Sequence, residues 1–368
     1  MKINILSPGR FHVLDLAREL DKQGHDVEFY SFVPTKRAQK YGLPKKCSKS
    51  IFLVMLPFLA LRKIFPKVWL FEKWRKIFQD WFTSKYMRKC DILIAMSGNV
   101  CSLERAKKDG AIVILERGSK HILEQKKILD SIPSLKGRIN VPAMNVQREL
   151  KGYQLADYIA IASQHVKDSL IKHGINDKKL FVNPYGVDLE MFKPIPDVKK
   201  EYDVIMVGGW SYRKGCDLII EAIKKLQVKF LHVGSIVDVD FPKDKLFTHI
   251  DSVDQKKLIH YYNKAKIFIL PSREEGLAMV QMQAVSCNLP LICSKDSGGE
   301  DLTKYFGQSK AISVLKETTS NELAKEIDAM LKYVASQPLE TVYYDMNGKS
   351  QLTWEAYGKR YSDFLKQI

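Results

Sequence analysis

The sequence predicts an α/β protein made of two doubly wound domains that face each other across a cleft. Three observations predict it. Short apolar runs alternate with helical patterns along nearly the whole chain, 368 residues are too many for one ordinary core, and a proline-bounded joint divides the pattern into two similar halves. Continuous apolar strands alternating with helices are typical of parallel sheets covered on both faces. Ligands bind at the carboxyl ends of such strands, so both sheets are expected to line one cleft.

Each half contains its own set of expected strands. In the first half the apolar runs are Lys2–Leu6, Val27–Val33, Ile92–Met96, Ile112–Leu115, Tyr158–Ile161 and Leu180–Asn183. In the second half they are Asp203–Val207, Lys229–Val233, Ile267–Leu270, Pro290–Cys293 and Ile312–Val314. We therefore expect an N-terminal domain over residues 1–183 and a C-terminal domain over residues 184–350, joined near Pro184–Pro196. The last helical pattern lies too far along for the second sheet, so residues 351–368 are expected to pack back on the first domain.

Positive charge is concentrated in one part of the chain. Between Lys36 and Lys89 there are 15 Lys and Arg residues against two acids, whereas the whole chain has 59 against 42. Such a patch suits nucleic acid, anionic lipid or an anionic substrate. No nucleic-acid-binding motif accompanies it, so no nucleic acid partner is expected.

The six cysteines indicate a reduced compartment. They form no CxxC pair and no zinc-ligand spacing, and several lie in apolar runs, so a cytosolic location is expected. The N-terminus reads at once as a strand, with no signal peptide before it. The most apolar run, Ile51–Leu61, has 11 residues, about half of what a bilayer requires, so no transmembrane helix is expected.

The basic region, residues 36–90, contains an amphipathic helix pattern with three tryptophans. Its apolar positions are Trp69, Leu70, Phe71, Trp74, Ile77, Phe78, Trp81 and Phe82, and its polar positions are Glu72, Lys73, Arg75, Lys76, Gln79 and Asp80. Aromatic side chains beside basic ones suit a helix that lies on an anionic membrane surface. An ordinary helix that packs its apolar face on the core fits the same pattern.

The strongest chemical signal follows an expected strand of the second half and opens a helix. There Glu275 stands at the carboxyl end of the strand, and Gly276 allows a close backbone approach to a ligand. The amides of Leu277 and Ala278, at the helix N-terminus, are placed to receive a phosphate. Gln283 lies about two turns further along and roughly on the same side, where it could hold a second part of the ligand. Spacing alone equally allows a capped turn with a surface Glu.

This segment resembles the E-x7-E signature of family 4 retaining glycosyltransferases, which have the GT-B fold. Glu275 to Gln283 matches E-G-(F/L)-(G/A)-x-x-x-x-E except that Gln283 replaces the second Glu. In the family the first Glu lies by the donor sugar and the second hydrogen-bonds the ribose of the nucleotide. The resemblance implies these roles here. An amide can still bond two hydroxyls, so donor binding is expected to survive the replacement.

A second segment, Val207–Gly215, resembles the family pattern G-R-x-x-x-x-K-G, in which Arg and Lys hold the diphosphate. Lys214 matches the Lys, but Gly209 occupies the usual Arg position, so Arg213 is expected to supply the missing charge. A departing nucleoside diphosphate gains negative charge, and fixed cations lower that barrier. Two solvated cations at a helix start are the alternative.

Two loops of the first domain are expected to face the cleft. Gly9 resembles the glycine of the family loop that covers the diphosphate, and Arg10 follows it. A glycine that serves only the turn between strand and helix is the alternative. Arg117 and Ser119 follow another strand, and we place them with Arg10 on the acceptor side. The family often has a His in this region that touches the transferred sugar, which makes His121 the candidate. A helix-capping or exposed His is the alternative.

The resemblance covers most of the chain and is weakest between Lys36 and Lys89. It implies a retaining glycosyltransferase that uses a UDP- or GDP-sugar and a glycan or lipid-linked glycan acceptor. The basic region adds the expectation that the protein is cytoplasmic and lies peripherally on the anionic inner face of a membrane. Asp238-Val239-Asp240 matches the Asp-x-Asp metal-binding motif of a different glycosyltransferase fold. Because it lies here in a loop of the expected nucleotide domain of a GT-B protein, we do not expect it to bind a metal, and no cofactor or essential metal is expected. A catalytically degenerate nucleotide-sugar binder, a GT-B sugar-nucleotide epimerase and a non-catalytic membrane adaptor remain open.

Overall fold

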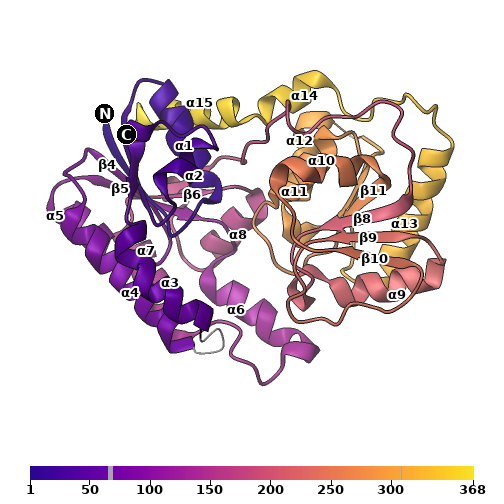
Figure 1. Ribbon diagram of the computed structural model, residues 1–368, viewed down its shortest axis with the longest axis horizontal. Coiled ribbons are helices and arrows are strands. Elements are labelled where there is room, and N and C mark those ends of the chain that lie inside the picture. Colours follow the sequence, from indigo (N-terminus) through magenta and orange to yellow (C-terminus); the bar gives the residue numbers. More distant parts are fainter. Residues whose placement is uncertain (65–68, 308) are drawn as a thin grey trace.

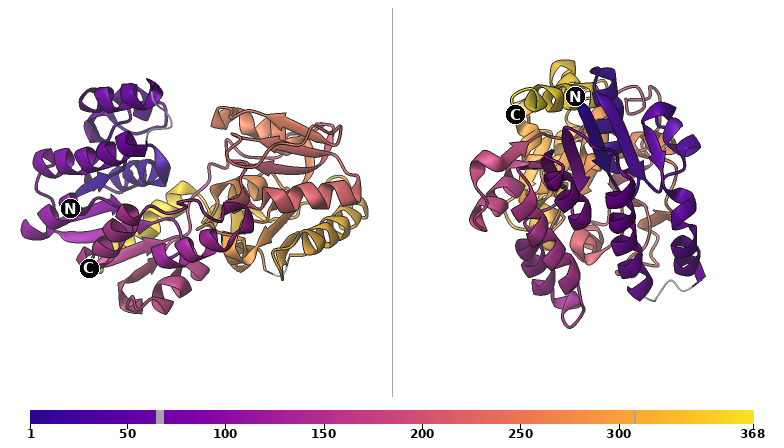
Figure 2. Two further views of the ribbon diagram at one scale, coloured as in Figure 1. Left: turned by 90° about the horizontal axis from the view of Figure 1, so that it is seen from below. Right: turned by 90° about the vertical axis from the view of Figure 1, so that its left-hand side faces the viewer.

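The computed structural model describes residues 1–64, 69–307 and 309–368, and it consists of two α/β domains side by side (Figures 1 and 2). The first contains a seven-stranded sheet in the order β3-β2-β1-β4-β5-β6-β7, and the second a six-stranded sheet in the order β10-β9-β8-β11-β12-β13. Every strand pair is parallel. The predicted fold class, two doubly wound domains, is confirmed.

The strands of the first sheet are β1 (Lys2–Leu6), β2 (Asp26–Ser31), β3 (Ser48–Ser50), β4 (Ile92–Met96), β5 (Ile112–Arg117), β6 (Tyr158–Ile161) and β7 (Leu180–Val182). Those of the second are β8 (Tyr202–Val207), β9 (Phe230–Val233), β10 (Phe247–Ile250), β11 (Ala265–Leu270), β12 (Leu291–Ser294) and β13 (Ile312–Leu315). Central strands are apolar on both faces, as in β11, where four consecutive residues are fully buried. Helices therefore have to cover both sides of each sheet.

The helices of the first domain are α1 (Phe11–Lys22), α2 (Thr35–Gln39), α3 (Phe52–Ile64), α4 (Trp69–Tyr86), α5 (Val100–Lys108), α6 (Ile122–Ser131), α7 (Ala143–Leu155) and α8 (Gln164–Lys172). Those that follow are α9 (Cys216–Leu226), α10 (Gln255–Asn263), α11 (Met279–Ser286), α12 (Thr303–Phe306), α13 (Ser320–Ala335), α14 (Met346–Gln351) and α15 (Trp354–Leu365). Short 3-10 turns are η1 (Lys45–Cys47), η2 (Pro133–Leu135), η3 (Asp177–Lys179), η4 (Tyr212–Lys214), η5 (Lys295–Ser297) and η6 (Gly299–Leu302).

The chain returns to the first domain at its end, where α15 packs on α1 (Figure 1). A Cβ on Gly358 would come within 2.3 Å of the Glu19 side chain, so the two helices are in close contact there. Phe364 stacks on Phe181 of β7 at 4.1 Å between ring centroids. The Tyr361 hydroxyl donates to the carboxylate of Glu116 at 2.8 Å, which ties α15 to the end of β5.

Two edge strands, β3 and β10, were not expected from the sequence. β3 has the sequence Ser-Lys-Ser and therefore no apolar run, and it exists because its backbone pairs with β2 from Phe29 to Ser31. The basic region is thus not a single insert. Its first part completes the edge of the sheet, and α3 and α4 form a helical pair, with Phe58 stacked on Phe78 at 4.8 Å.

Helix α4 buries Arg75, Gln79 and Asp80 of its polar face. Asp80 is fully buried, and its carboxylate accepts hydrogen bonds from the amides of Cys101 and Ser102, both at 2.9 Å, at the start of α5. Trp74 and Trp81 are instead 52% and 47% exposed. The side chains of Trp69, Leu70 and Phe71, which complete the expected apolar face, lie outside the described residues. Trp74 and Trp81 therefore do not pack on the core, whereas Ile77, Phe78 and Phe82 of the same face are half-buried.

Candidate active site

A carboxylate and two cations meet where the second domain faces the first. Glu275 lies in the loop between β11 and α11, and Arg213 and Lys214 lie in η4, after β8. The Lys214 ammonium pairs with the Glu275 carboxylate, and Arg213 approaches the same Oε2 at 3.4 Å. Both loops lie at the same edge of the sheet, because they follow the carboxyl ends of β8 and β11, which are paired parallel strands.

This cluster keeps Glu275 ionised. Burial alone would raise the pKa of Glu275, but the charges of Lys214 and then of Arg213 outweigh burial, so the pKa lies below its ordinary value. Lys214 is itself almost completely buried, at 8% exposure. A buried pair of this kind holds fixed charge in a poorly hydrated site, where electrostatic interactions are strong.

The neighbouring residue, Glu274, links the two domains. It is fully buried, and its carboxylate accepts hydrogen bonds from the Gln125 side chain at 3.0 Å and the Lys120 amide at 3.4 Å. Lys120 also forms a 2.6 Å ion pair with Asp296 across the domain boundary. Sequence reasoning singled out none of these residues, because their partners lie in the other domain.

The backbones of the two domains are in contact at Gly276. A Cβ on Gly276 would come within 2.1 Å of the carbonyl oxygen of Gly118, so a side chain cannot fit in this arrangement. The Ser163 hydroxyl donates to the Gly276 carbonyl at 3.3 Å, and His165 lies 2.9 Å from the Glu275 carbonyl. The loop that carries Glu275 is therefore fixed by the first domain.

A cavity of about 530 Å³, here called the interdomain cavity, lies between the domains in front of the charge cluster. Residues expected to bind the donor line much of it, and the full lining is Arg10, Phe11, His12, Met96, Gly118, Tyr185, Val207, Gly208, Gly209, Lys214, Val253, Gln255, Leu258, Glu275, Leu277, Ala278, Met279, Val280 and Gln283. Leu277 and Ala278 stand at the start of α11, whose first amides point along the helix axis. An anion in this cavity would meet Lys214 and that helix end.

Gln283 reaches the interdomain cavity from α11, as the sequence predicts. Its Oε1 accepts a 3.0 Å hydrogen bond from the Tyr262 hydroxyl, and the residue is 6% exposed. This bond orients the amide, so Nε2 is the donor that remains for a ligand.

The histidine that reaches the cavity is His12, not His121. His12 Nε2 lies 2.9 Å from the Glu116 carboxylate, which Tyr361 also binds, so α15 supports this pair. His121 caps α6 by accepting from the Leu123 amide, stacks on His173 at 4.2 Å, and lines neither cavity described here. Burial, with His173 and Arg117 nearby, lowers the pKa of His121 to about 4. The expectation that His121 faces the cleft is not met, because its ring serves as a helix cap.

The three residues expected on the acceptor side, Arg10, Arg117 and Ser119, lie in different places. Arg10 lines the interdomain cavity and donates to Gln255 of the second domain. Arg117 lines a second cavity, and its guanidinium donates to the Lys120 carbonyl and to Gln125. The Ser119 hydroxyl accepts a 3.3 Å hydrogen bond from Gln125 and lines neither cavity.

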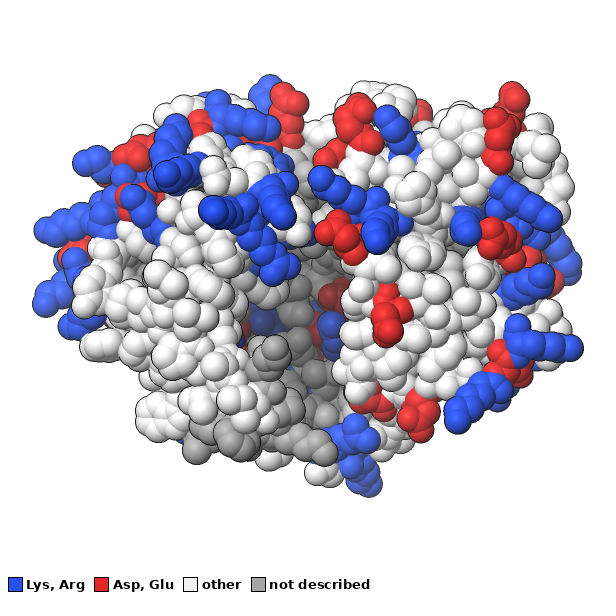
Figure 3. Space-filling view, in the orientation of Figure 1, with Lys and Arg blue, Asp and Glu red and all other residues white. Residues whose placement is uncertain are grey.

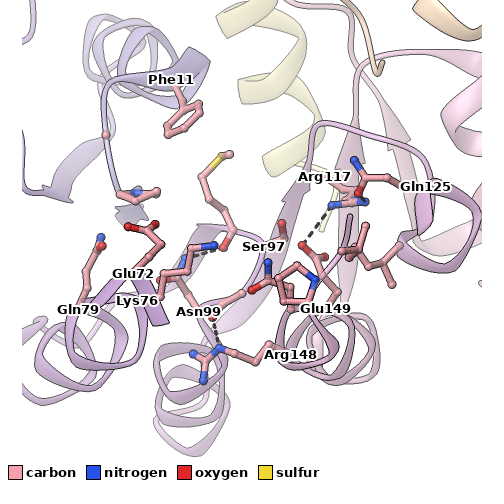
Figure 4. A pocket seen from close by; sticks show the side chains of 18 of the residues that line it. Phe11, Glu72, Lys76, Gln79, Ser97, Asn99, Arg117, Gln125, Arg148 and Glu149 are labelled. Carbon is pink, nitrogen blue, oxygen red and sulfur yellow. Dashed lines mark hydrogen bonds and ion pairs between the residues drawn. The ribbon is translucent and has the colours of Figure 1, made fainter. Parts of the chain in front are cut away.

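The second cavity, of about 740 Å³, is lined by the first domain and by Arg213 of the second, and it is here called the α4–α7 cavity (Figures 3 and 4). It is lined by Pro8, Gly9, Phe11, Phe32, Glu72, Arg75, Lys76, Gln79, Met96, Ser97, Gly98, Asn99, Arg117, Ile122, Gln125, Leu129, Asn140, Val141, Pro142, Asn145, Arg148, Glu149 and Arg213. Phe11 and Met96 line both cavities, so the two adjoin. Phe11 has a φ of 26°, a strained value for a residue with a side chain.

Among the described residues, no cluster of three or more His, Cys, Asp and Glu side chains could hold a metal ion. Asp238, from the Asp-x-Asp pattern, accepts a 2.9 Å hydrogen bond from the Tyr212 amide and thereby fixes η4.

Both halves of the chain match models of known protein families. The model described as Glycosyltransferase Family 4 matches residues 10–191, and that described as Glycosyl transferases group 1 matches residues 188–337. A phosphatidylinositol N-acetylglucosaminyltransferase subunit of Arabidopsis thaliana is 22% identical over 253 residues, which cover 64% of this chain and 55% of that protein. The chain spans about half the length of the curated relatives it matches.

Two solved structures show the same fold along the full length. Anabaena HepE, in complex with UDP and glucose, has a TM-score of 0.69 at 14% identity, and the match covers 100% of both chains. The UDP-GlcNAc 2-epimerase of Methanocaldococcus jannaschii has a TM-score of 0.55 at 12% identity, again over 100% of both chains.

Proposed function

Since the chain belongs to glycosyltransferase family 4 and has the GT-B fold, we propose that it transfers a glycosyl unit from a nucleotide-diphosphate sugar, with retention of configuration. The observation that carries the proposal is the pairing of Lys214 and Arg213 with Glu275. Lys214 and Glu275 line the interdomain cavity, and Arg213 lines the adjoining α4–α7 cavity. Two fixed cations beside a helix N-terminus form a site for a diphosphate.

In this proposal the diphosphate lies against Lys214 and the first turn of α11, and the Gln283 side chain hydrogen-bonds a ribose hydroxyl. The sugar then lies near Glu275, toward the junction with the α4–α7 cavity. The acceptor hydroxyl oxygen bonds to the anomeric carbon as the bond to the phosphate oxygen breaks. The leaving phosphate takes the hydroxyl proton, so no separate base is required. Lys214 and Arg213 stabilise the charge that grows on the phosphate.

The nucleotide is proposed to be UDP or GDP. The structural neighbour HepE was solved with UDP and with glucose, which supports a nucleotide-sugar donor of this kind. The test is to incubate the protein with UDP- and GDP-sugars and a set of glycan acceptors, and to follow both nucleotide release and the labelled sugar. Transfer to an acceptor supports the proposal. Binding without turnover would favour a degenerate nucleotide-sugar binder, which Gln283 and Gly209 suggest, and interconversion of the free sugar nucleotide would favour an epimerase.

Replacing Gln283 by Glu, the residue typical of the family, is expected to be tolerated and to tighten nucleotide binding. A carboxylate accepts stronger hydrogen bonds from ribose hydroxyls than an amide does, and the Tyr262 hydroxyl can still donate to it. Isothermal titration with UDP and GDP measures the change. A collapse of affinity in Gln283→Glu would mean that the ligand needs the amide as a donor.

We also propose that the protein lies peripherally on the cytoplasmic, anionic face of a membrane through α3 and α4. Leu53, Leu56 and Ile64 of α3 are 76%, 41% and 66% exposed and recur at helical spacing, so they share one face. In Figure 3 the described surface beside the grey atoms, at the lower left, is largely white, and Lys and Arg gather above it on the same domain. An apolar face bordered by basic side chains suits anionic lipid.

All six cysteines are free thiols, which fits a reducing compartment. Among the described residues, no helix is long and apolar enough to cross a bilayer.

The purified protein is therefore expected to pellet with anionic vesicles, much less with neutral ones, and to come off with salt. Each Lys or Arg near such a surface contributes about 1 kcal/mol, and the field decays over about 8 Å at physiological salt. The double variant Trp74→Ser/Trp81→Ser should bind more weakly and still hydrolyse donor. The matched control is Ile139→Ser/Leu339→Ser, because both residues are highly exposed outside α3 and α4. A protein that stays in the supernatant with both kinds of vesicle contradicts this proposal.

A further inference from the structure

The α4–α7 cavity has features of a binding site in its own right. It adjoins the interdomain cavity at Phe11 and Met96, and Arg213 of the charge cluster reaches its edge. If the proposed function holds, a molecule in this cavity lies next to the donor sugar, in the position that the acceptor must take.

The wall of this cavity carries more positive than negative charge. Its lining contains five cations, Arg75, Lys76, Arg117, Arg148 and Arg213, against two acids, Glu72 and Glu149. Each of the four arginines has a carboxylate within 4 Å. Arg75 binds Glu72, Arg117 binds Glu149, Arg148 binds Asp80, and Arg213 binds Glu274 and Glu275.

Lys76 differs from the arginines. Within the part of the chain that the structure describes, its ammonium has neither an ion pair nor a hydrogen bond, although it lines the cavity (Figure 4). Partial desolvation lowers the pKa of Lys76 below its ordinary value, while the nearby charge of Glu72 acts to raise it and that of Arg75 acts to lower it. An anion at this point would stabilise that charge.

Glu149 offers the complementary group. It is 7% exposed and lines the cavity, and its Oε1 is 3.2 Å from Arg117. Its Oε2 is buried and has no hydrogen-bond partner among the described residues. An unsatisfied buried carboxylate oxygen is costly, so it is suited to a ligand that donates, such as a sugar hydroxyl. Asn145, on the same helix α7, also lines the cavity, and its side chain makes no hydrogen bond within the described chain.

We propose that the α4–α7 cavity binds an acceptor sugar that carries a phosphate or carboxylate, with Lys76 on the anionic group and Glu149 Oε2 on a hydroxyl. The anion can belong to a soluble sugar phosphate or uronate, or to the phosphorylated headgroup of a lipid. Helix α4 is compatible with both sources, because it presents Lys76 to the cavity and Trp74 and Trp81 to the outside.

Direct binding tests the proposal without relying on catalysis. Hexose 1-phosphate, hexose 6-phosphate and hexuronate are titrated against the uncharged hexose, with and without UDP. At least one anionic sugar is expected to bind about tenfold or more tightly than the hexose. Lys76→Met should remove this preference, Lys76→Arg should keep it, and Lys85→Met should leave it unchanged, because exposed Lys85 is on the same helix but outside the cavity. Glu149→Gln should weaken the hexose and its phosphate alike, with the Tm measured because Glu149 also pairs with Arg117.

A second arm separates the two sources of the anion. The same phosphorylated headgroup is displayed on neutral vesicles, and tighter binding there than in solution assigns a lipid-borne acceptor, whereas equal binding assigns a soluble one. The proposal is overturned if no anionic sugar is preferred in either arm, or if Lys76→Met binds it as the wild type does. Nucleotide binding by the same proteins is measured separately, so a failure of the donor assignment is distinguishable from a failure of this one.

Discussion

Replacing Lys214 by alanine is expected to lower the rate of glycosyl transfer about 10² to 10³-fold with the fold intact. Removal of one fixed group that stabilises charge in the transition state costs on the order of 2 to 4 kcal/mol. Lys214 is the cation that pairs most closely with Glu275, and it lines the interdomain cavity. Arg213→Ala should have a similar but separate effect, because its guanidinium approaches the same carboxylate from the side of the α4–α7 cavity.

The measurement is kcat and kcat/KM for transfer, with the Tm as a check on folding. Lys266→Ala is the matched control, since Lys266 also pairs with a carboxylate, that of Asp203 at 2.8 Å, but lies outside both cavities. If Lys214→Ala and Arg213→Ala both keep near-normal turnover, the diphosphate assignment is wrong.

Gly276→Ala is expected to lower kcat/KM by about two orders of magnitude and to leave the stability of each domain nearly unchanged. The added methyl would come within 2.1 Å of the Gly118 carbonyl oxygen, and neither backbone can retreat without moving its domain. The domains would then separate by about an ångström, and a displacement of that size at reacting groups can cost about 10²-fold. The backbone at Gly276 imposes no positive φ, so the clash between the domains is the cause.

Gly152→Ala is the matched control for this variant. Gly152 lies within α7, and the nearest atom to an added Cβ is 3.6 Å away, which is ordinary contact. Activity and small-angle scattering together give the readout. A Gly276→Ala protein that is fully active in the same compact shape would show that the contact between Gly276 and Gly118 is not part of the active arrangement.

The fold was predictable from the sequence because burial on both faces makes parallel strands continuous apolar runs. Eleven such runs coincide with strands, and β11 and β12 appear within two residues of the expected bounds. The two strands that the sequence did not predict, β3 and β10, lie at sheet edges. An edge strand pairs with only one neighbouring strand, and its apolar pattern is weak. The local amino-acid composition does not predict backbone pairing at such edges.

The part of the candidate site that follows a single strand was predictable from the sequence. Glu275, Leu277, Ala278 and Gln283 follow one strand, and the structure places all four on the interdomain cavity. Contacts between elements were not predictable in this way. The burial of polar residues on α4 depends on Asp80 capping α5, and the choice of His12 over His121 depends on Glu116 and on stacking with His173.

The central claim is that the interdomain cavity binds a nucleoside diphosphate at Lys214. Isothermal titration of UDP and GDP into the wild type and Lys214→Ala tests it most directly, because it requires no knowledge of the acceptor or the sugar. We predict that one of the two nucleotides binds the wild type with one-to-one stoichiometry, and that Lys214→Ala weakens binding about tenfold or more. Absence of binding by both nucleotides, or equal binding by the wild type and the variant, would contradict the claim.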